Sequence, residues 1–257
     1  MFASSPKKIC SPRAAGSCLL QALLTVPADS RCNNFALLKV SSVRIPKVGA
    51  RYIVPFSNEA KLKIGILAVQ GDFEAHATRL RELGAETLEV RTIADLEQCD
   101  GLILPGGEST TQLQFLQEEG LYDAIRNFAN SGRAIFGTCA GAILLATEVK
   151  NPPQSSLRLM DMTVLRNAYG RQVASDVFFG PCKLKSGPME MVFIRGPIIE
   201  RAGNSLEVLA EYAGKPVLVQ NKNLLAATFH PELTSDATVH EHFLQMASAH
   251  SAKPATA

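Results

Sequence analysis

Short apolar runs alternate with helical patterns from residue 61 onward. Residues 63–69 and 101–104 are almost continuously apolar, which is typical of strands buried on both faces of a sheet. Residues 73–83 place apolar side chains at helical spacing and stop before Gly84. The same patterns predict further strands at residues 87–90 and 134–136 and helices at residues 110–117, 122–130 and 142–147.

The second half of the chain is richer in predicted strands. These lie at residues 192–195, 207–210, 216–220 and 224–229, and a terminal helix is predicted at residues 236–247. The alternation predicts an α/β fold, a three-layer sandwich with a mostly parallel central sheet and helices on both faces. Active sites of such sheets lie beyond the carboxyl ends of the strands, where two glycine-rich breaks occur, at residues 105–107 and 137–141.

The first 60 residues differ from the rest in charge. They hold eight Lys or Arg and two acidic residues, whereas the whole chain of 257 residues has a net charge of only +2. This composition fits a transit peptide, a secretory signal, or a disordered tail or upstream region included through a misassigned start. The last interpretation is favoured, and the transit peptide is next. The predicted organisation is a basic leader at residues 1–60, an enzymatic domain at 61–250 and a disordered tail at 251–257.

Bulk composition argues against several classes of function. Hydrophobic residues make up 46% of the chain and charged residues 19%, and the small net charge gives no sign of a nucleic-acid or membrane partner. No apolar run reaches the roughly 18 residues of a membrane helix. The six cysteines form no C-x-x-C pair and no cluster with metal-ligand spacing. We therefore expect no metal and a reducing, cytoplasmic location, with import through the leader left open.

Residues 137–141, Gly-Thr-Cys-Ala-Gly, fit a nucleophile elbow between a strand and a helix. Small flanking residues suit the sharp turn that exposes such a nucleophile. The following helix would point its N-terminus at Cys139 and favour the thiolate, and the Ala140 amide would face a developing oxyanion. Cys139 is the predicted nucleophile, and an inert cysteine in a tight turn is the alternative.

Residues 229–233, Phe-His-Pro-Glu-Leu, follow a predicted strand. In an extended chain His230 and Glu232 would project to the same side, so that Glu232 could orient His230 as a base toward Cys139. A single histidine at a strand end is more often an ordinary polar residue, but this pairing makes His230 the leading candidate. The remaining histidines are predicted to be surface or capping residues: His76, His240, His242 and His250.

Residues 104–111, Leu-Pro-Gly-Gly-Glu-Ser-Thr-Thr, end another predicted strand. The glycines permit close backbone approach to a ligand, and Gly107 can offer a second N–H to an oxyanion. A phosphate loop is the competing interpretation, but the spacing differs from that of the P-loop and Glu108 would oppose phosphate. A purely structural turn before a helix stays open.

Together these motifs resemble the class-I glutamine amidotransferases and, within them, the glutaminase subunit of pyridoxal 5′-phosphate synthase (the PdxT/SNO family). The resemblance covers residues 61–249, and Gly196 and residues 177–189 depart from the usual family sequence. It rests on Ala-Val-Gln-Gly at 68–71, Pro-Gly-Gly-Glu-Ser-Thr at 105–110, Gly-Thr-Cys-Ala-Gly at 137–141, Arg-Asn-Ala-Tyr-Gly-Arg-Gln at 166–172, Phe-Ile-Arg at 193–195 and His-Pro-Glu at 230–232. Many amidotransferases share the cysteine and histidine motifs, whereas the motifs at 105–110, 166–172 and 193–195 are much more specific to this subfamily.

The resemblance implies roles for individual residues. Cys139, His230 and Glu232 would form the catalytic triad, with the amides of Gly107 and Ala140 as the oxyanion hole. Gln70 matches a loop residue tied to oxyanion-hole formation and to the synthase interface. The implied glutamine-binding residues are Gly107, Glu108, Ser109, Arg166, Ile194 and Arg195. An arginine suits this role independently, because glutamine carries an α-carboxylate.

The implied function is hydrolysis of L-glutamine to L-glutamate and ammonia, with the ammonia passed to a synthase subunit that makes pyridoxal 5′-phosphate in a large hetero-oligomer. No cofactor is expected. One alternative is a glutaminase subunit of another pathway, such as histidine or purine biosynthesis. The other is a non-catalytic regulatory subunit on the same fold.

Overall fold

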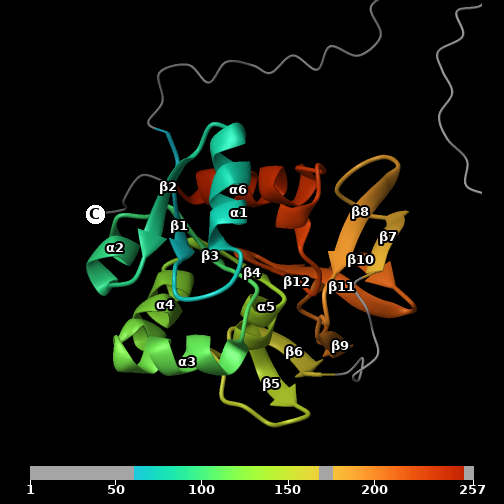
Figure 1. Ribbon diagram of the computed structural model, residues 1–257, viewed down its shortest axis with the longest axis horizontal. Helices are drawn as coiled ribbons and strands as arrows, with labels where there is room; N and C mark the ends of the chain where they lie inside the picture. Colours follow the sequence, from blue (N-terminus) through green and yellow to red (C-terminus); the bar gives the residue numbers. More distant parts are fainter. Residues whose placement is uncertain (1–60, 168–175, 252–257) are drawn as a thin grey trace, which may run out of the picture. The chain divides into compact units, whose positions relative to one another are not determined.

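A seven-stranded sheet forms the centre of the computed structural model, which describes residues 61–167 and 176–251 (Figure 1). Its strand order is β10-β11-β12-β4-β3-β1-β2. The strands are β1 Lys63–Leu67, β2 Glu86–Val90, β3 Gly101–Leu104, β4 Ala134–Thr138, β10 Glu207–Tyr212, β11 Lys215–Asn221 and β12 Leu224–Ala227. The five strands from β2 to β12 run parallel, and β11 and β10 extend the sheet in antiparallel pairing.

Helices cover both faces of this sheet and complete three layers (Figure 1). On one face lie α1 Phe73–Glu82 and α6 Thr238–Ser251, and on the other lie α3 Ser109–Glu118, α4 Leu121–Asn130 and α5 Ala140–Leu145. Adjacent residues of β3 show the division, since Leu102 packs in the core under α3 and α4 and Ile103 packs in the core under α1 and α6. Strands buried on both faces consist of continuous apolar runs, which is why these strands could be predicted from the sequence. The predicted α/β fold is confirmed.

Two smaller sheets extend the second half of the chain, and the sequence pattern found little of them. One sheet contains β5 Ala146–Lys150, β6 Met160–Leu165 and β9 Ile198–Ala202, and the other is the hairpin of β7 Asp176–Pro181 and β8 Pro188–Phe193. The predicted helix at 142–147 was wrong in its last two residues, because Ala146 begins β5 and pairs with Met160 of β6. The predicted strand at 192–195 was wrong beyond Phe193, where β8 ends.

One short helix also escaped the sequence pattern. Helix α2 spans Ile93–Glu97 and is too short for apolar periodicity to appear. It is held by a capping box in which the Thr92 side chain accepts from the Asp95 amide while the Asp95 carboxylate accepts from the Thr92 amide.

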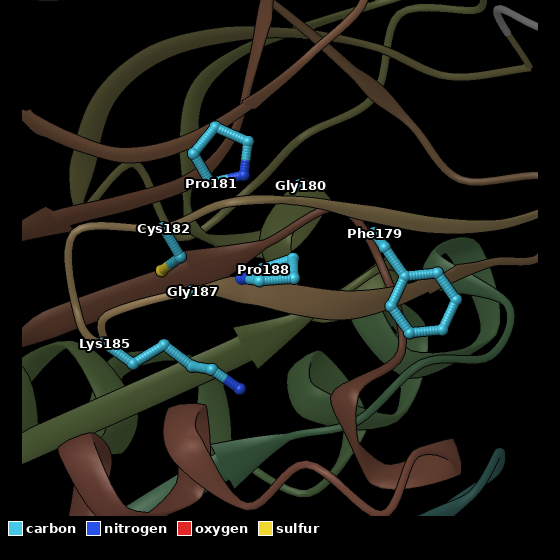
Figure 2. A pocket seen from close by; sticks show the side chains of 7 residues that line it. All are labelled: Phe179, Gly180, Pro181, Cys182, Lys185, Gly187 and Pro188. Atoms are coloured by element: carbon cyan, nitrogen blue, oxygen red, sulfur yellow. The ribbon is translucent and has the colours of Figure 1, made fainter.

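The β7–β8 hairpin includes most of the stretch that departs from the usual family sequence. A hollow of about 400 Å³ opens at the hairpin, with the Phe179 ring at one end and Lys185 toward the other (Figure 2). Phe179 is 61% exposed. None of the lining residues belongs to the predicted site. Within the described residues, no helix is long and apolar enough to cross a membrane.

The sheet order decides where the chemistry can occur. Strands β12, β4, β3 and β1 are direct neighbours and run parallel, so their carboxyl ends share one edge. The segments that leave this edge carry His230, Cys139, Gly106 and Gln70. Four segments far apart in the sequence therefore meet around Cys139, the predicted nucleophile.

Candidate active site

Cys139 occupies a strained turn between β4 and α5. Its backbone angles are φ 47° and ψ −99°, in the left-handed half of conformational space, and its amide donates to the Ala227 carbonyl of β12 at 2.8 Å. A Cβ at Gly137 would lie 2.6 Å from the Gly141 backbone, and one at Gly141 would lie 2.0 Å from the Leu104 carbonyl oxygen. Both flanking glycines are therefore required by close backbone packing, as a nucleophile elbow demands.

His230 and Glu232 form a buried pair beside this turn. Nδ1 of His230 lies 2.7 Å from Oε1 of Glu232, and both residues are 5% exposed. The Cys139 side chain also lies close enough to the imidazole to raise the pKa of His230. The structure thus brings together the three residues that the sequence singled out as nucleophile, base and orienting carboxylate.

The reason given for the His230–Glu232 pairing was wrong, although the pairing is present. Residues 230–232 are not extended, because Pro231–Leu233 forms a short 3-10 helix, η2. His230 sits at the start of that helix with φ −109° and ψ 84°. The tight turn brings the carboxylate back to the imidazole, and Pro231 suits the first helical position because it has no N–H to leave unpaired.

Burial alone would lower the pKa of His230, but its bonds with Cys139 and Glu232 outweigh burial and raise that pKa to about 10. Burial likewise opposes ionisation of Glu232, whereas His76 and His230 favour it, and the net effect is a lowered Glu232 pKa. His230 and Glu232 thus stabilise each other as a buried pair of opposite charges. An imidazolium facing a thiolate is the active arrangement of a cysteine nucleophile.

The two loops beside Cys139 are in very close backbone contact. A Cβ at Gly71 would lie 1.7 Å from the Gly106 carbonyl oxygen, and one at Gly106 would lie 2.5 Å from Cε1 of His230. Gly107 has a φ of +139°, a backbone conformation that residues with a side chain rarely adopt. The loop that carries Gln70 therefore rests directly on the loop that carries Gly107.

The predicted glutamine-binding residues lie on three segments. Nη2 of Arg166 lies 3.1 Å from Oε1 of Glu108 and 2.9 Å from Oγ1 of Thr110. Ser109 is buried and donates from Oγ to the Gln154 side chain at 3.0 Å. The structure thereby joins Glu108, Ser109 and Arg166 in one polar cluster.

Ile194 and Arg195 follow β8, with Ile194 half-buried, Arg195 exposed and a φ of +46° at Arg195. No hydrogen bond links either side chain to the polar cluster within the described residues. Gly196 departs from the usual family residue, and a Cβ there would lie 2.5 Å from the Thr228 carbonyl oxygen. Of the motif at residues 166–172, positions 168–172 lie outside the described residues.

The chain matches the family model described as the SNO glutamine amidotransferase family over residues 66–249. It belongs to that family. The match spans the elbow, the histidine–glutamate pair and both loops, so the predicted family and enzyme class of this glutamine amidotransferase are confirmed.

Curated relatives agree with the family model. A protein of Koribacter versatilis (strain Ellin345) named pyridoxal 5′-phosphate synthase subunit PdxT is 51% identical over 185 residues, which are 72% of this chain and 95% of the relative. A Thermotoga maritima protein of the same name is 48% identical over 186 residues, 72% of this chain and 99% of the relative. The matched part of this amidotransferase is therefore nearly the whole length of those relatives.

Two solved structures have the same fold as this chain. A crystal structure described as a glutamine amidotransferase has a TM-score of 0.68 and 45% identity, covering 72% of this chain and 98% of that one. The structure of PurLQS from Thermotoga maritima has a TM-score of 0.54 at 15% identity and covers 72% of this chain and 99% of that one. At such low identity the second likeness shows the fold alone.

Sequence reasoning missed two histidines of this amidotransferase. His76 and His240 were predicted to be surface or capping residues, which is wrong, because both are 0% exposed. His242 is half-buried and lies 2.6 Å from Gln220, and the His250 side chain lies outside the described residues. A signal was present, since His76 adjoins the apolar position Ala77 on α1, and His240 adjoins Val239 on α6.

Two glutamines were also missed. Gln112 is 0% exposed, and its Nε2 donates to the carbonyls of Pro105, Gly106 and Gln70 at 3.2 to 3.4 Å. Gln154 pairs with Ser109 through both of its amide atoms. Helical spacing placed Gln112 next to buried Leu113, but a polar residue there gave no clue to its partners.

Proposed function

We propose that this amidotransferase hydrolyses L-glutamine through a triad of Cys139, His230 and Glu232. The observation that carries the proposal is the buried 2.7 Å contact between His230 and Glu232 beside Cys139, which lies at a strained elbow. A nucleophile, a base and an orienting carboxylate in this order are the requirement for acyl transfer through a covalent intermediate.

The proposed reaction has two halves. His230 takes the proton of the Cys139 thiol, and the thiolate attacks the side-chain amide carbon of glutamine. The tetrahedral intermediate collapses, the C–N bond breaks, and ammonia leaves with the proton from His230. A water molecule deprotonated by His230 then attacks the γ-glutamyl thioester, which releases glutamate and returns the proton to Cys139.

We assign the oxyanion hole to the amides of Gly107 and Ala140. Ala140 follows the nucleophile directly, and Gly107 lies on the loop that packs against Cys139 and His230 through Gly106. Backbone amides held in fixed positions stabilise the charge that develops in the transition state. The assigned glutamine-binding residues are Gly107, Glu108, Ser109, Arg166, Ile194 and Arg195.

We further propose that ammonia serves a pyridoxal 5′-phosphate synthase subunit. The names and identities of the curated relatives support this, since the chain spans at least 95% of their lengths. Gln70 is the proposed contact with the synthase, because its loop is exposed and rests on the oxyanion loop. None of the similar proteins described above that has comparable identity is named for histidine or purine biosynthesis.

Residues 61–250 are the proposed glutaminase domain, and the family match to residues 66–249 supports that range. The roles of residues 1–60 and 251–257, and a cytoplasmic location, stay predictions.

The test is glutamate release from glutamine by the purified full chain, with and without a pyridoxal 5′-phosphate synthase subunit, compared with Cys139→Ala. We expect release that rises with the synthase subunit and disappears in the variant. No release under either condition, with binding of the synthase subunit demonstrated, would make a regulatory subunit the better assignment. Release that depends on Cys139 but ignores the synthase subunit would keep the glutaminase and reject the pathway.

A further inference from the structure

A buried polar chain continues behind the triad. Oε2 of Glu232, the oxygen that does not contact His230, makes no hydrogen bond within the described residues. Nε2 of His76 faces this oxygen at 3.4 Å, and the side chains of both residues are 0% exposed. The same nitrogen lies 3.1 Å from Oγ1 of Thr138, the residue before the nucleophile.

The series of buried polar side chains does not end at His76. Its Nδ1 lies 3.0 Å from Nε2 of His240, and Nδ1 of His240 is buried without a hydrogen-bond partner among the described residues. Two imidazoles from two helices, α1 and α6, therefore meet nitrogen to nitrogen behind the carboxylate of the triad, with their ring planes tilted by 52°. Burying two histidines and a carboxylate in an apolar core is costly unless they interact favourably with one another.

Chemistry assigns the protons along this chain. If Nδ1 of His76 carried its proton, the lone pair on Nε2 would face the Glu232 carboxylate, which is repulsive. With the proton on Nε2, an N–H dipole points toward Glu232 and Thr138, and Nδ1 accepts from Nε2–H of His240. This arrangement leaves only an unprotonated nitrogen of His240 unpaired.

The electrostatics agree with this assignment. Burial lowers the pKa of His76 although Glu232 and Asp72 oppose the change, and His230 adds to it. Burial also lowers the pKa of His240, with His76 and Arg79 acting in the same direction. Both imidazoles are therefore neutral near pH 7, and Glu232 receives a dipole rather than a second cation.

We infer that His76, held in place by His240, is a positioning residue that extends the triad: its Nε2–H fixes the Glu232 carboxylate, which in turn fixes Nδ1–H of His230 against Cys139. This inference rests on the proposed roles of the triad. His76 touches neither the nucleophile nor the substrate site directly, so its effect passes through Glu232 and His230 alone.

Two amide substitutions separate positioning from packing. The side-chain nitrogen of glutamine can reach the place of Nε2, whereas that of asparagine reaches only the place of Nδ1. His76→Gln therefore keeps a donor toward Glu232 and His76→Asn loses it, although both are small buried amides. His76→Phe removes every polar atom at similar size. His242→Gln is the matched control, because His242 lies on α6 and bonds Gln220 instead of the triad.

The readout is the rate at which iodoacetamide alkylates Cys139, followed by mass spectrometry of the peptide that contains it, from pH 5 to pH 10. This assay needs neither glutamine nor a synthase subunit. Leaving the buried Glu232 carboxylate without the N–H that faces it at 3.4 Å should weaken its hold on the His230 imidazolium by about 10-fold to 100-fold. We expect His76→Asn and His76→Phe to slow alkylation at pH 7 by that factor and His76→Gln to restore most of the native rate.

Equal alkylation rates and pH profiles in the asparagine, glutamine and native proteins would overturn the inference and leave His76 a packing residue. If His76→Phe fails to fold, the comparison of His76→Asn with His76→Gln still tests whether His76 positions Glu232. Failure of the proposed function would be seen in a different experiment. Native protein that released no glutamate, or released as much as Cys139→Ala, would overturn the proposed function, and the alkylation rates of Cys139 would be unchanged by that result.

Discussion

Gly106 lies so close to His230 that a Cβ added to Gly106 would come within 2.5 Å of Cε1 of the imidazole and 3.6 Å of the Cβ of Cys139. His230, the proposed base, thus packs directly on the backbone of the proposed oxyanion loop. A displacement of that loop would therefore move the imidazole as well. The proposed oxyanion hole and the proposed base cannot change position independently of each other.

Gly106→Ala should lower the rate of glutamate release on the order of 100-fold while the chain stays folded. The new methyl group has to displace the imidazole, and a misplacement of about 1 Å costs on the order of 100-fold in rate. Glutamate release with the synthase subunit measures the effect. Gly120→Ala is the control for adding a methyl group to a glycine away from the site, because Gly120 precedes α4 and a Cβ there meets only Ile93, at 3.7 Å. Its φ of +69° means that alanine should lower stability there, but the folded variant should keep native activity. Native activity in Gly106→Ala would contradict this close packing.

The pKa of His230 predicts how stability depends on pH. That pKa is about 10 in the folded chain and near 6.5 when unfolded, so the folded state binds the proton more tightly. The resulting stabilisation is complete below pH 6.5 and is lost as the pH rises toward 10. Unfolding by urea at several pH values should show this decline, and His230→Gln should lack it.

Cys139→Ala should lower the pKa of His230. Burial opposes the raised pKa, and the hydrogen bond with Cys139 is the largest effect that offsets burial. NMR titration of the His230 ring should therefore show a lower midpoint in the variant than in the native chain. An unchanged midpoint would mean that Glu232 alone keeps the imidazole charged.

Arg166→Ala should weaken glutamine binding more than it slows turnover. Its guanidinium is largely buried and is held by Glu108 and Thr110 at one side of the proposed glutamine site. Loss of a charge-assisted bond to the α-carboxylate should raise KM by about 10-fold to 100-fold. Lys150→Ala, which removes a surface cation paired with Glu200, should change neither constant. A fall in kcat alone would instead place Arg166 near the reacting amide.

Gln112→Leu should reduce the response to the synthase subunit. The Gln112 amide bonds carbonyls of both loops, namely those of Gln70 and of Pro105 and Gly106, and leucine fills similar space without a donor. Buried carbonyls left without a partner cost about 1 to 3 kcal/mol each, so the loops should separate or rearrange. Thermal unfolding and stimulated glutamate release measure the two consequences. Gln114→Leu, on the same helix but bonded to Glu118 at the surface, should behave like the native chain.

Local sequence was sufficient for the parts of the site that depend on short-range geometry. The elbow at Cys139 needs glycines two residues away on either side, and the structure shows the backbone contacts that exclude side chains at Gly137 and Gly141. His230 and Glu232 are two residues apart, so almost any compact turn brings them together. The prediction of that pair held although the chain there is a 3-10 turn and not extended.

Continuous apolar runs likewise determined most of the central sheet, because a strand such as Gly101–Leu104 is buried on both faces and tolerates little else. The small sheets were not determined in this way. Strand β5, Ala146–Lys150, is partly exposed and is stabilised by pairing with β6, so its sequence carries no pattern of its own.

Only the tertiary structure decided which polar residues of the helices are buried. His76 and His240 are separated by 164 residues and meet because α1 and α6 cover the same face of the sheet. A histidine on an amphipathic helix is compatible with solvent or with the core, and local sequence does not distinguish them. What distinguishes them is a partner, and the partners of His76 are supplied by β4, η2 and α6, three elements brought together only when the sheet order is set.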